Sequence, residues 1–231
     1  MNLSLSPRLL ACSQFVAPGS RVADVGCDHG YLSIYLLKNG IAQRVIASDI
    51  NEQPLLSAVN NAAKYGVRDR ITFCLSDGVK DIPRDFDCMI CAGMGADTMI
   101  SILEAAPWLK SSAYTLILQC QSKTPTLRRY LSEQGWSIEE EAVLRDGRFL
   151  YTVMRVLWNP SCEKLTPGQQ YFSPVLLKRP SKELAEYYRW ITEGLRIATI
   201  HQNDSEKAAA LAELEQLTQN PHLNWLKEDT V

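Results

Sequence analysis

The sequence has no long apolar run. A helix needs roughly 20 consecutive apolar residues to span a bilayer, and no stretch of the 231 residues provides them. The first ten residues, M-N-L-S-L-S-P-R-L-L, also lack the apolar core of a signal peptide. From these absences we expect no membrane partner and a cytoplasmic location.

Cysteine and histidine show neither the spacing of a disulfide framework nor that of a metal centre. The seven cysteines are odd in number and irregularly spaced, which fits a reducing compartment. Cys88 and Cys91 lie three residues apart in an expected strand, where side chains three apart face opposite sides of the sheet. They are therefore expected to be core thiols. No other Cys or His grouping has zinc spacing, so no metal is predicted.

A strong net charge is also missing. The formal net charge is −2, so the protein as a whole does not attract nucleic acid, and RNA contact would need a local basic surface. Eight basic residues could form a phosphate-contacting surface, although scattered arginines are more often a solvated face. They are Arg128, Arg129, Arg145, Arg148, Lys178, Arg179, Lys182 and Arg189.

A distinctive turn motif lies near the amino terminus. Residues 22–31 read V-A-D-V-G-C-D-H-G-Y, in which Asp24, Gly26 and Gly30 form D-x-G-x-x-x-G. This pattern predicts a strand end, a tight turn that small residues allow, and a helix whose first N–H groups carry partial positive charge. The nicotinamide fingerprint needs glycine at positions 26, 28 and 31, but 28 and 31 are aspartate and tyrosine. The spacing instead resembles the first motif of class I S-adenosylmethionine (SAM) methyltransferases.

Strand and helix patterns alternate five times, and an expected antiparallel hairpin over residues 136–144 and 149–157 follows. Asn51 and Thr124 are the expected N-caps of the third and fifth helices. The order predicts an α/β fold with a Rossmann-like, mostly parallel sheet. Strands are expected over residues 21–25, 44–48, 71–75, 87–91 and 114–120, and helices over 5–16, 30–38, 51–65, 97–105 and 124–135.

The character of the sequence changes after residue 157. Residues 158–180 contain four prolines and predict an irregular connector. A seam of apolar residues with spacings of four and three then runs from Leu184 to Ala198, and a second apolar pattern follows a break at Asn203-Asp204. We expect a methyltransferase-like domain over residues 1–157, then a linker and a helical hairpin over 158–231.

Candidate functional residues lie at four strand ends, in residues 26–30, 49–51, 77–78 and 92–95. In a parallel sheet these ends meet at one edge, where ligands bind. This coincidence is the strongest functional signal in the sequence.

Each polar candidate has a second, purely structural interpretation. Asp49 can accept both ribose hydroxyls of an adenosine group, or it can cap the next helix. Asp77 can accept from an adenine amino group, or it can form a turn. Asp28 can pair with the ammonium of the methionine part, and His29 can contact the cofactor or the base, but both can also be turn residues.

The segment A-G-M-G, Ala92 to Gly95, lies where amino-group nucleic-acid methylases carry an Asn- or Asp-Pro-Pro-aromatic motif. Glycine supplies no side-chain acceptor for an exocyclic amine, but it permits close backbone approach. A ring nitrogen such as adenine N1 has its own lone pair. The segment therefore favours a ring-nitrogen target.

These residues resemble a known family, the bacterial tRNA (adenine(22)-N1)-methyltransferases. The resemblance extends to about Val156, and the family also has a helical carboxyl-terminal appendage. It rests on L-S-x-R-L (Leu5 to Leu9), D-V-G-C-D-H-G-Y-L (Asp24 to Leu32), S-D-I-N (Ser48 to Asn51), A-G-M-G, and L-I-L-Q (Leu116 to Gln119) followed by Leu127-Arg128.

The resemblance implies methyl transfer from SAM to N1 of an adenosine in tRNA, with position 22 expected. His29 and Asp28 are the candidate catalytic residues, and Arg8, Tyr31 and Asp97 are candidates for the substrate side. The candidate cofactor residues are Asp24, Gly26, Cys27, Asp28, His29, Gly30, Asp49, Ile50, Asn51, Asp77, Gly78, Ala92, Gly93, Met94 and Gly95.

Two other functions remain open at this point. A class I methyltransferase acting on a small molecule or a protein would keep the cofactor site without RNA. A non-catalytic SAM-binding module would use the helical hairpin as its working part. The sequence sets no oligomeric state, and a monomer is compatible with every one of these functions.

Overall fold

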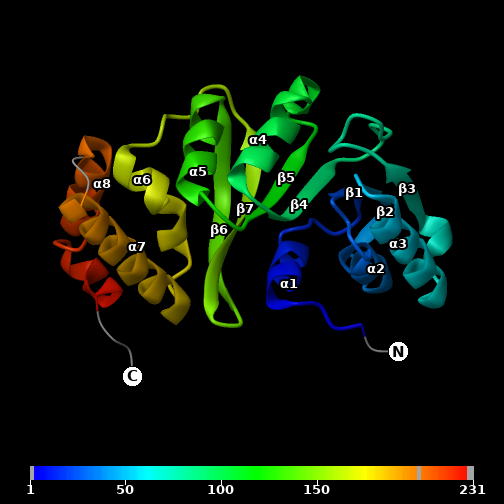
Figure 1. The fold of residues 1–231 in the computed structure, drawn as a ribbon, viewed down its shortest axis with the longest axis horizontal. Helices are drawn as coiled ribbons and strands as arrows, with labels where there is room; N and C mark the ends of the chain where they lie inside the picture. Colours follow the sequence, from blue (N-terminus) through cyan, green and yellow to red (C-terminus); the bar gives the residue numbers. More distant parts are fainter. Residues whose placement is uncertain (1–2, 202–203, 228–231) are drawn as a thin grey trace.

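A seven-stranded sheet forms the centre of the molecule in the computed structural model, which describes residues 3–201 and 204–227. The strand order is β3-β2-β1-β4-β5-β7-β6 (Figure 1). The first five strands of the chain pair in parallel, whereas β7 runs antiparallel to both β5 and β6. The strands are β1 (Ser20–Val25), β2 (Ala42–Asp49), β3 (Ile71–Leu75), β4 (Cys88–Met94), β5 (Thr115–Cys120), β6 (Trp136–Asp146) and β7 (Phe149–Trp158).

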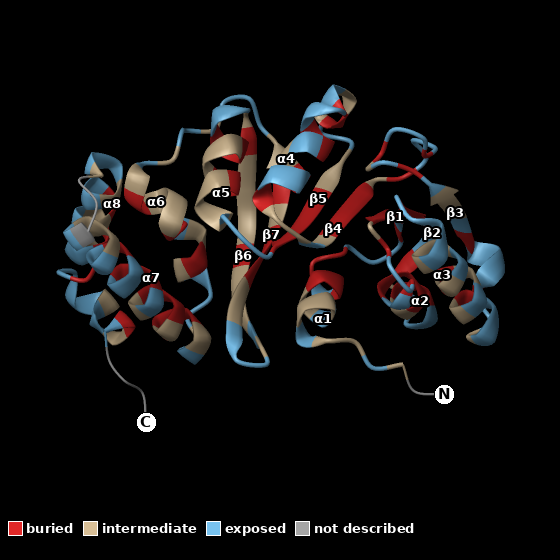
Figure 2. Cartoon of the chain, viewed as in Figure 1, coloured by how far each residue is buried: buried red, intermediate tan, exposed pale blue. Residues whose placement is uncertain are grey.

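Helices cover both faces of this sheet. On one face α1 (Pro7–Gln14), α2 (Tyr31–Lys38) and α3 (Glu52–Lys64) enclose a core around Ile34 and Ile90. On the other face α4 (Ala96–Glu104) and α5 (Thr124–Glu133) enclose a second core. The central strands are buried on both sides, as Figure 2 shows for β4 and β5. This burial explains the continuous apolar runs of these strands.

The expected α/β fold, with its parallel strands and closing hairpin, is confirmed. Two expected helix starts were wrong, whereas the expected N-cap residue of α3 is in place. The first helix begins at Pro7, because the Ser6 hydroxyl accepts from the Leu9 amide at 3.5 Å. Asn51 is at the N-cap position of α3, but no capping bond from its side chain is present in the described structure. Thr124 lies inside α5, whose N-cap position is Lys123 with a φ of 57°.

The carboxyl-terminal helices pack beside β6 (Figure 1). The longest, α7, pairs with α8, so the expected helical hairpin is present. Asp204 caps α8 by accepting from two amide groups, and Asn203 lies outside the described residues. The elements are α6 (Pro167–Tyr171), α7 (Lys182–His201) and α8 (Ser205–Leu217), with 3-10 turns at Arg68–Arg70, Pro107–Leu109, Pro174–Lys178 and Pro221–Leu226.

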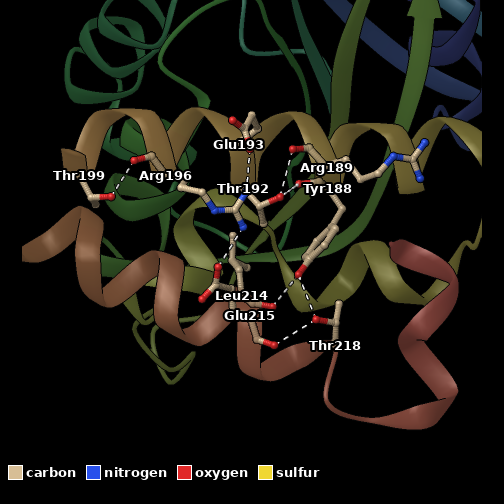
Figure 3. Close-up of polar contacts among 9 residues, drawn as sticks. All are labelled: Tyr188, Arg189, Thr192, Glu193, Arg196, Thr199, Leu214, Glu215 and Thr218. Carbon is tan, nitrogen blue, oxygen red and sulfur yellow. Dashed lines mark hydrogen bonds and ion pairs between the residues drawn. The ribbon is translucent and has the colours of Figure 1, made fainter. Parts of the chain in front are cut away.

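Polar contacts join α7 to α8 (Figure 3). The Tyr188 hydroxyl donates to the Leu214 carbonyl at 2.7 Å, and Arg196 forms ion pairs with Glu193 and Glu215 at 2.6 and 3.0 Å. The apolar core beneath them includes side chains from β6 and β7. The helical part is therefore continuous with the hairpin that ends the sheet.

Arg128 contradicts its expected place in a phosphate-contacting surface. Its side chain is fully buried, and it forms an ion pair with the equally buried Glu141 at 2.6 Å. The sequence pattern did not reveal this pair, because Arg128 is on α5 and its partner Glu141 is on β6, the next strand. Of the other expected surface residues, Arg145 and Arg179 pair with carboxylates, and Arg129 lies 3.4 Å from Glu206.

No helix in the described ranges combines the length and apolar character needed to cross a membrane.

Candidate active site

The turn after β1 is built from backbone conformations that favour glycine. Gly26 and Gly30 have φ values of 74° and 73°, and Asp28 between them has a φ of 49°. The amides of Gly26 and Cys27 both donate to the Ser48 carbonyl, at 2.8 and 2.9 Å. The turn is therefore tied to the end of β2, and Cys27 is buried beneath it.

The two glycines also permit close packing. A Cβ at Gly30 would lie 2.9 Å from the Ala58 Cβ, so this position lets α3 approach the turn. A Cβ at Gly26 would overlap the Met94 Cε. The turn and the A-G-M-G segment consequently touch across the strand ends, as their common edge position predicted.

Asp49 has the structural role considered for it, at the start of the helix that follows β2. The residue is only 8% exposed. Its Oδ2 accepts from the Asp28 amide at 3.1 Å and its Oδ1 accepts from the Asn51 amide at 2.9 Å. It therefore holds the glycine turn and the start of α3, and each oxygen retains a lone pair for a ligand.

A cavity of about 290 Å³ opens at these strand ends. Six of the candidate cofactor residues line it: Gly26, Asp49, Ile50, Asp77, Gly78 and Met94. The sequence analysis missed Val25, Ser76, Lys80, Thr98, Ser101, Ile102 and Ala105. The last four, three on α4 and one at its C-cap residue Ala105, recur at spacings of three, one and three. This spacing marks one helical face, but such a face is equally compatible with a place in the hydrophobic core.

Asp77 is exposed and forms an ion pair with Lys80 at the mouth of the cavity. Surface pairs of this kind contribute little to stability, so a ligand can displace the lysine. The backbone beneath is fixed by Ser76, whose hydroxyl donates to the Gly78 carbonyl at 3.1 Å.

Asp24 lies below the cavity and does not line it. Its Oδ2 accepts from the Ser33 hydroxyl at 2.6 Å. Burial raises the pKa of Asp24 from its usual 3.8 to about 6, against the opposing effect of the Ser33 hydrogen bonds. In this structure Asp24 positions α2 against β1.

The two candidate catalytic residues lie on the outer side of the turn. Asp28 and His29 are both exposed, and the His29 Nε2 lies 3.5 Å from the Asp28 Oδ1. The Tyr31 ring is 6.1 Å from the His29 ring. None of these three residues belongs to the cavity wall.

The A-G-M-G segment is linked to the residues after β5. The Gly93 amide donates to the buried Gln119 Oε1 at 3.0 Å, and the Gln121 amide donates to the Met94 carbonyl at 2.8 Å. Gly95 precedes Ala96, whose amide donates to the Ser122 carbonyl at 3.1 Å. Gly93 itself is exposed, whereas Ala92 is half-buried.

The two charged candidates for the substrate side each have a partner in the protein. Arg8 donates from Nε to the Asp146 Oδ2 at 2.6 Å, and its guanidinium lies over the Tyr151 ring. It therefore lies beside the β6–β7 turn, outside the cavity wall. Asp97 pairs with Lys123 at 2.6 Å, and both side chains are exposed.

Comparison with known proteins assigns the family. The model of a family described as "Methyltransferase domain" matches residues 5–154. A tRNA (adenine(22)-N(1))-methyltransferase of Bacillus subtilis is 31% identical over 154 residues, which are 66% of this chain and 65% of that enzyme. A Mycoplasma genitalium protein described as a "putative tRNA methyltransferase" is 30% identical over 172 residues, 73% of this chain and 76% of the relative.

Solved structures extend the likeness to the carboxyl-terminal helices. A Streptococcus pneumoniae protein described as a "putative tRNA (m1A22) methyltransferase" has a TM-score of 0.81 and 27% identity, covering 94% of this chain and 99% of its own. Its complex with S-adenosyl-L-methionine has a TM-score of 0.79 and 29% identity, covering 90% and 97%. The family model spans more than half of the sequence, and the chain therefore belongs to the class I methyltransferase-domain family.

Proposed function

We propose that this protein transfers a methyl group from SAM to N1 of adenosine 22 in tRNA. The observation that carries the proposal is the cavity at the ends of β1 to β4, where a glycine turn and the Asp49 carboxylate meet. Relatives that bear this activity in their names, and the neighbour that binds SAM, support it.

The cavity suits SAM in size and in chemistry. Its volume of about 290 Å³ is near the lower end of small-ligand sites, roughly 300 Å³. Asp49 would accept from the ribose hydroxyls, while Asp77, Ile50 and Gly78 would contact the adenine. The glycine turn would receive the methionine part. SAM supplies an electrophilic methyl group on a sulfonium.

The remaining candidates would border the cofactor as follows. Cys27, Asp28, His29 and Gly30 belong to the turn that faces the methionine part, with Asp24 fixing it from below. Asn51 follows the ribose-binding strand end, and residues 92–95 form the side nearest the acceptor.

The protein's part in the reaction is to align two reactants. Adenine N1 attacks with its own lone pair, so no base has to remove a proton first. Holding the ring nitrogen in line with the methyl group supplies most of the acceleration. The exposed backbone at Gly93 allows close approach of the base, and His29 and Asp28 adjoin the same edge.

An adenosine in folded tRNA has to be unstacked before it can reach this edge. We propose that residues 1–157 carry the chemistry and that the linker and helices over 158–231 add surface for the RNA. A monomer acting in the cytoplasm is sufficient for this function.

The test is to incubate the purified protein with SAM and an unmodified tRNA transcript, then map the methylated nucleoside by mass spectrometry. We expect 1-methyladenosine at position 22, and none with Asp49→Ala. Methyl transfer only to a protein or a small molecule would replace the RNA assignment. SAM binding without any transfer would indicate a non-catalytic module.

A further inference from the structure

A second cavity, of about 330 Å³, lies between α7 and the segment that follows β5. Its wall includes Ser122 and Pro125 from that segment, Thr152 on β7, and Tyr187 and Trp190 on α7. It is separate from the proposed SAM cavity, and the two share no lining residue. Nothing in the methyl-transfer scheme above uses it.

A buried hydroxyl in this cavity has no partner. Thr152 is 2% exposed, and its Oγ1 makes no hydrogen bond within residues 3–201 and 204–227. An unpaired buried hydroxyl costs free energy, and nearly all such groups in folded proteins are paired. Thr152 lines the cavity, so a rotation of its side chain would let a ligand with a polar edge supply the missing bond.

An exposed indole borders the same cavity. Trp190 is 66% exposed, and its ring lies 6.1 Å from the Tyr187 ring at an interplanar angle of 34°. The next turn of α7 presents Gly194, where a Cβ would meet no described atom within 4 Å. This side of α7 is therefore open, and it offers a flat aromatic surface to a ligand.

The cavity adjoins the proposed methyl-transfer edge through one segment. Ser122 lines the cavity, and its carbonyl accepts from the Ala96 amide at the start of α4. Gln121 also lines it, and its amide donates to the Met94 carbonyl. Lys123 adds a positive charge at this wall, in an exposed pair with Asp97 that an anion can displace.

We propose that this cavity binds an unstacked nucleobase of the substrate RNA, an inference that rests on the proposed function. A base has two flat faces for Trp190 and a polar edge for the Thr152 hydroxyl, and its phosphate is attracted to Lys123. An apolar protein side chain would leave the hydroxyl unpaired. The base is either the acceptor adenine or a neighbour of it.

The first test compares binding of unmodified tRNA to three variants. Trp190→Ala should raise the Kd for tRNA about tenfold, since stacking on an aromatic contributes roughly 1–3 kcal/mol per base. Trp190→Phe, which keeps a ring, should recover most of the affinity. Ile197→Ala removes another exposed apolar side chain of α7, outside the cavity wall, and should have no effect.

A second test identifies the base. The effect of Trp190→Ala is measured on transcripts that carry one abasic nucleotide, either at the acceptor position or at each neighbouring position. The effect should vanish at one of these positions. If the effect of Trp190→Ala vanishes when the acceptor nucleotide is abasic, the cavity binds the acceptor adenine. If it vanishes when a neighbouring nucleotide is abasic, the cavity binds that flanking base. If the effect persists at all positions, Trp190 does not stack on a base and the proposal fails.

Thr152→Val separates binding from folding. Removing an unpaired buried hydroxyl should raise the midpoint of thermal unfolding of the free protein. It should also weaken tRNA binding two- to tenfold, the value of a single hydrogen bond. Greater stability with unchanged tRNA affinity would overturn the role of Thr152.

The wild-type protein distinguishes the two proposals. If it methylates tRNA while the Trp190 and Thr152 variants bind tRNA normally, only the base-binding cavity is wrong. If the wild type transfers no methyl to tRNA, the proposed function itself is wrong.

Discussion

At Asp49, one carboxylate holds two backbone segments that border the proposed SAM cavity. We expect Asp49→Ala to weaken SAM binding by roughly 100-fold or more, because hydrogen bonds to a charged group contribute about 1.5–3 kcal/mol each. The amides of Asp28 and Asn51 also lose their acceptor, so the turn should loosen. Isothermal titration with SAM measures the loss.

Asp69→Ala serves as the matched control for Asp49, because it removes an exposed carboxylate from the turn before β3. Its SAM affinity should equal that of the wild type. Unchanged affinity in Asp49→Ala would remove the ribose assignment. Thermal unfolding of both variants shows whether any loss of binding reflects a loss of fold.

Asp24 predicts a pH dependence of stability. Its pKa is about 6 in the folded protein and 3.8 ordinarily, so folding favours the protonated form. The stability that this proton confers is complete below pH 3.8 and is lost as pH rises through about 6. The pKa difference corresponds to roughly 3 kcal/mol. Asp24→Asn should therefore stabilise the protein at pH 7 and much less at pH 4, measured by urea unfolding at both values.

The opposite result for Asp24, with asparagine destabilising at pH 7, would mean that the ionised carboxylate is satisfied where it lies. Ser33→Ala is the companion variant, since it removes the hydroxyl that donates to Asp24. That loss should raise the pKa of Asp24 further and lower stability at pH 7.

At the scale of the element, the turn between β1 and α2 depends on contact with the end of β4. Gly26→Ala should destabilise the protein by about 2–4 kcal/mol and abolish SAM binding. The added methyl group overlaps the Met94 Cε, and a positive φ costs roughly 1–2 kcal/mol in a residue with a Cβ. Thermal unfolding and SAM titration report the two effects.

The double variant Gly26→Ala/Met94→Ala separates the overlap from the backbone strain. Removing the Met94 side chain relieves the overlap, so the double variant should lose less stability than the sum of the two single variants. Additive losses would show that the two side chains do not meet.

The strands could be predicted from the sequence because each is a short apolar run that ends in a turn residue. The strand that contains Asp24 is an example, because the glycines that follow it have the positive φ values of a tight turn. Helix starts were less predictable. Lys123 occupies the N-cap position of α5, although Thr124-Pro125 is the stronger local signal, because residues 120–123 are held by contacts to β4 and α4.

The residues that α4 contributes to the cavity wall could not be predicted from the sequence. Thr98 and Ser101 line the proposed SAM cavity only because α4 packs with that face toward the strand ends. The burial of Arg128 depends on Glu141, thirteen residues away, and on carbonyls more than forty residues away. Such partners are set by tertiary packing, and local periodicity carries no information about them.

For the whole molecule, the buried Arg128 joins the methyltransferase part to the helical part. From α5 it reaches Glu141 on β6, and its Nη1 donates to the carbonyls of Gln170 and Tyr171 in α6 at 2.9 and 2.8 Å. Its Nη2 lies 3.4 Å from the Tyr187 hydroxyl of α7. Tyr187 also lines the proposed base cavity, so this ion pair sets the position of α7 relative to the sheet.

Arg128→Met should therefore destabilise the protein by about 3–5 kcal/mol, because it leaves the Glu141 carboxylate buried without its cation. Arg128→Met/Glu141→Leu removes both charges and should recover most of that loss. The carbonyls of Gln170 and Tyr171 stay unpaired in the double variant. It should accordingly fold and bind SAM normally but bind tRNA more weakly, since α7 is less firmly placed. Urea unfolding, SAM titration and tRNA binding measure these three properties, and equal tRNA affinity in the wild type and the double variant would contradict the positioning role.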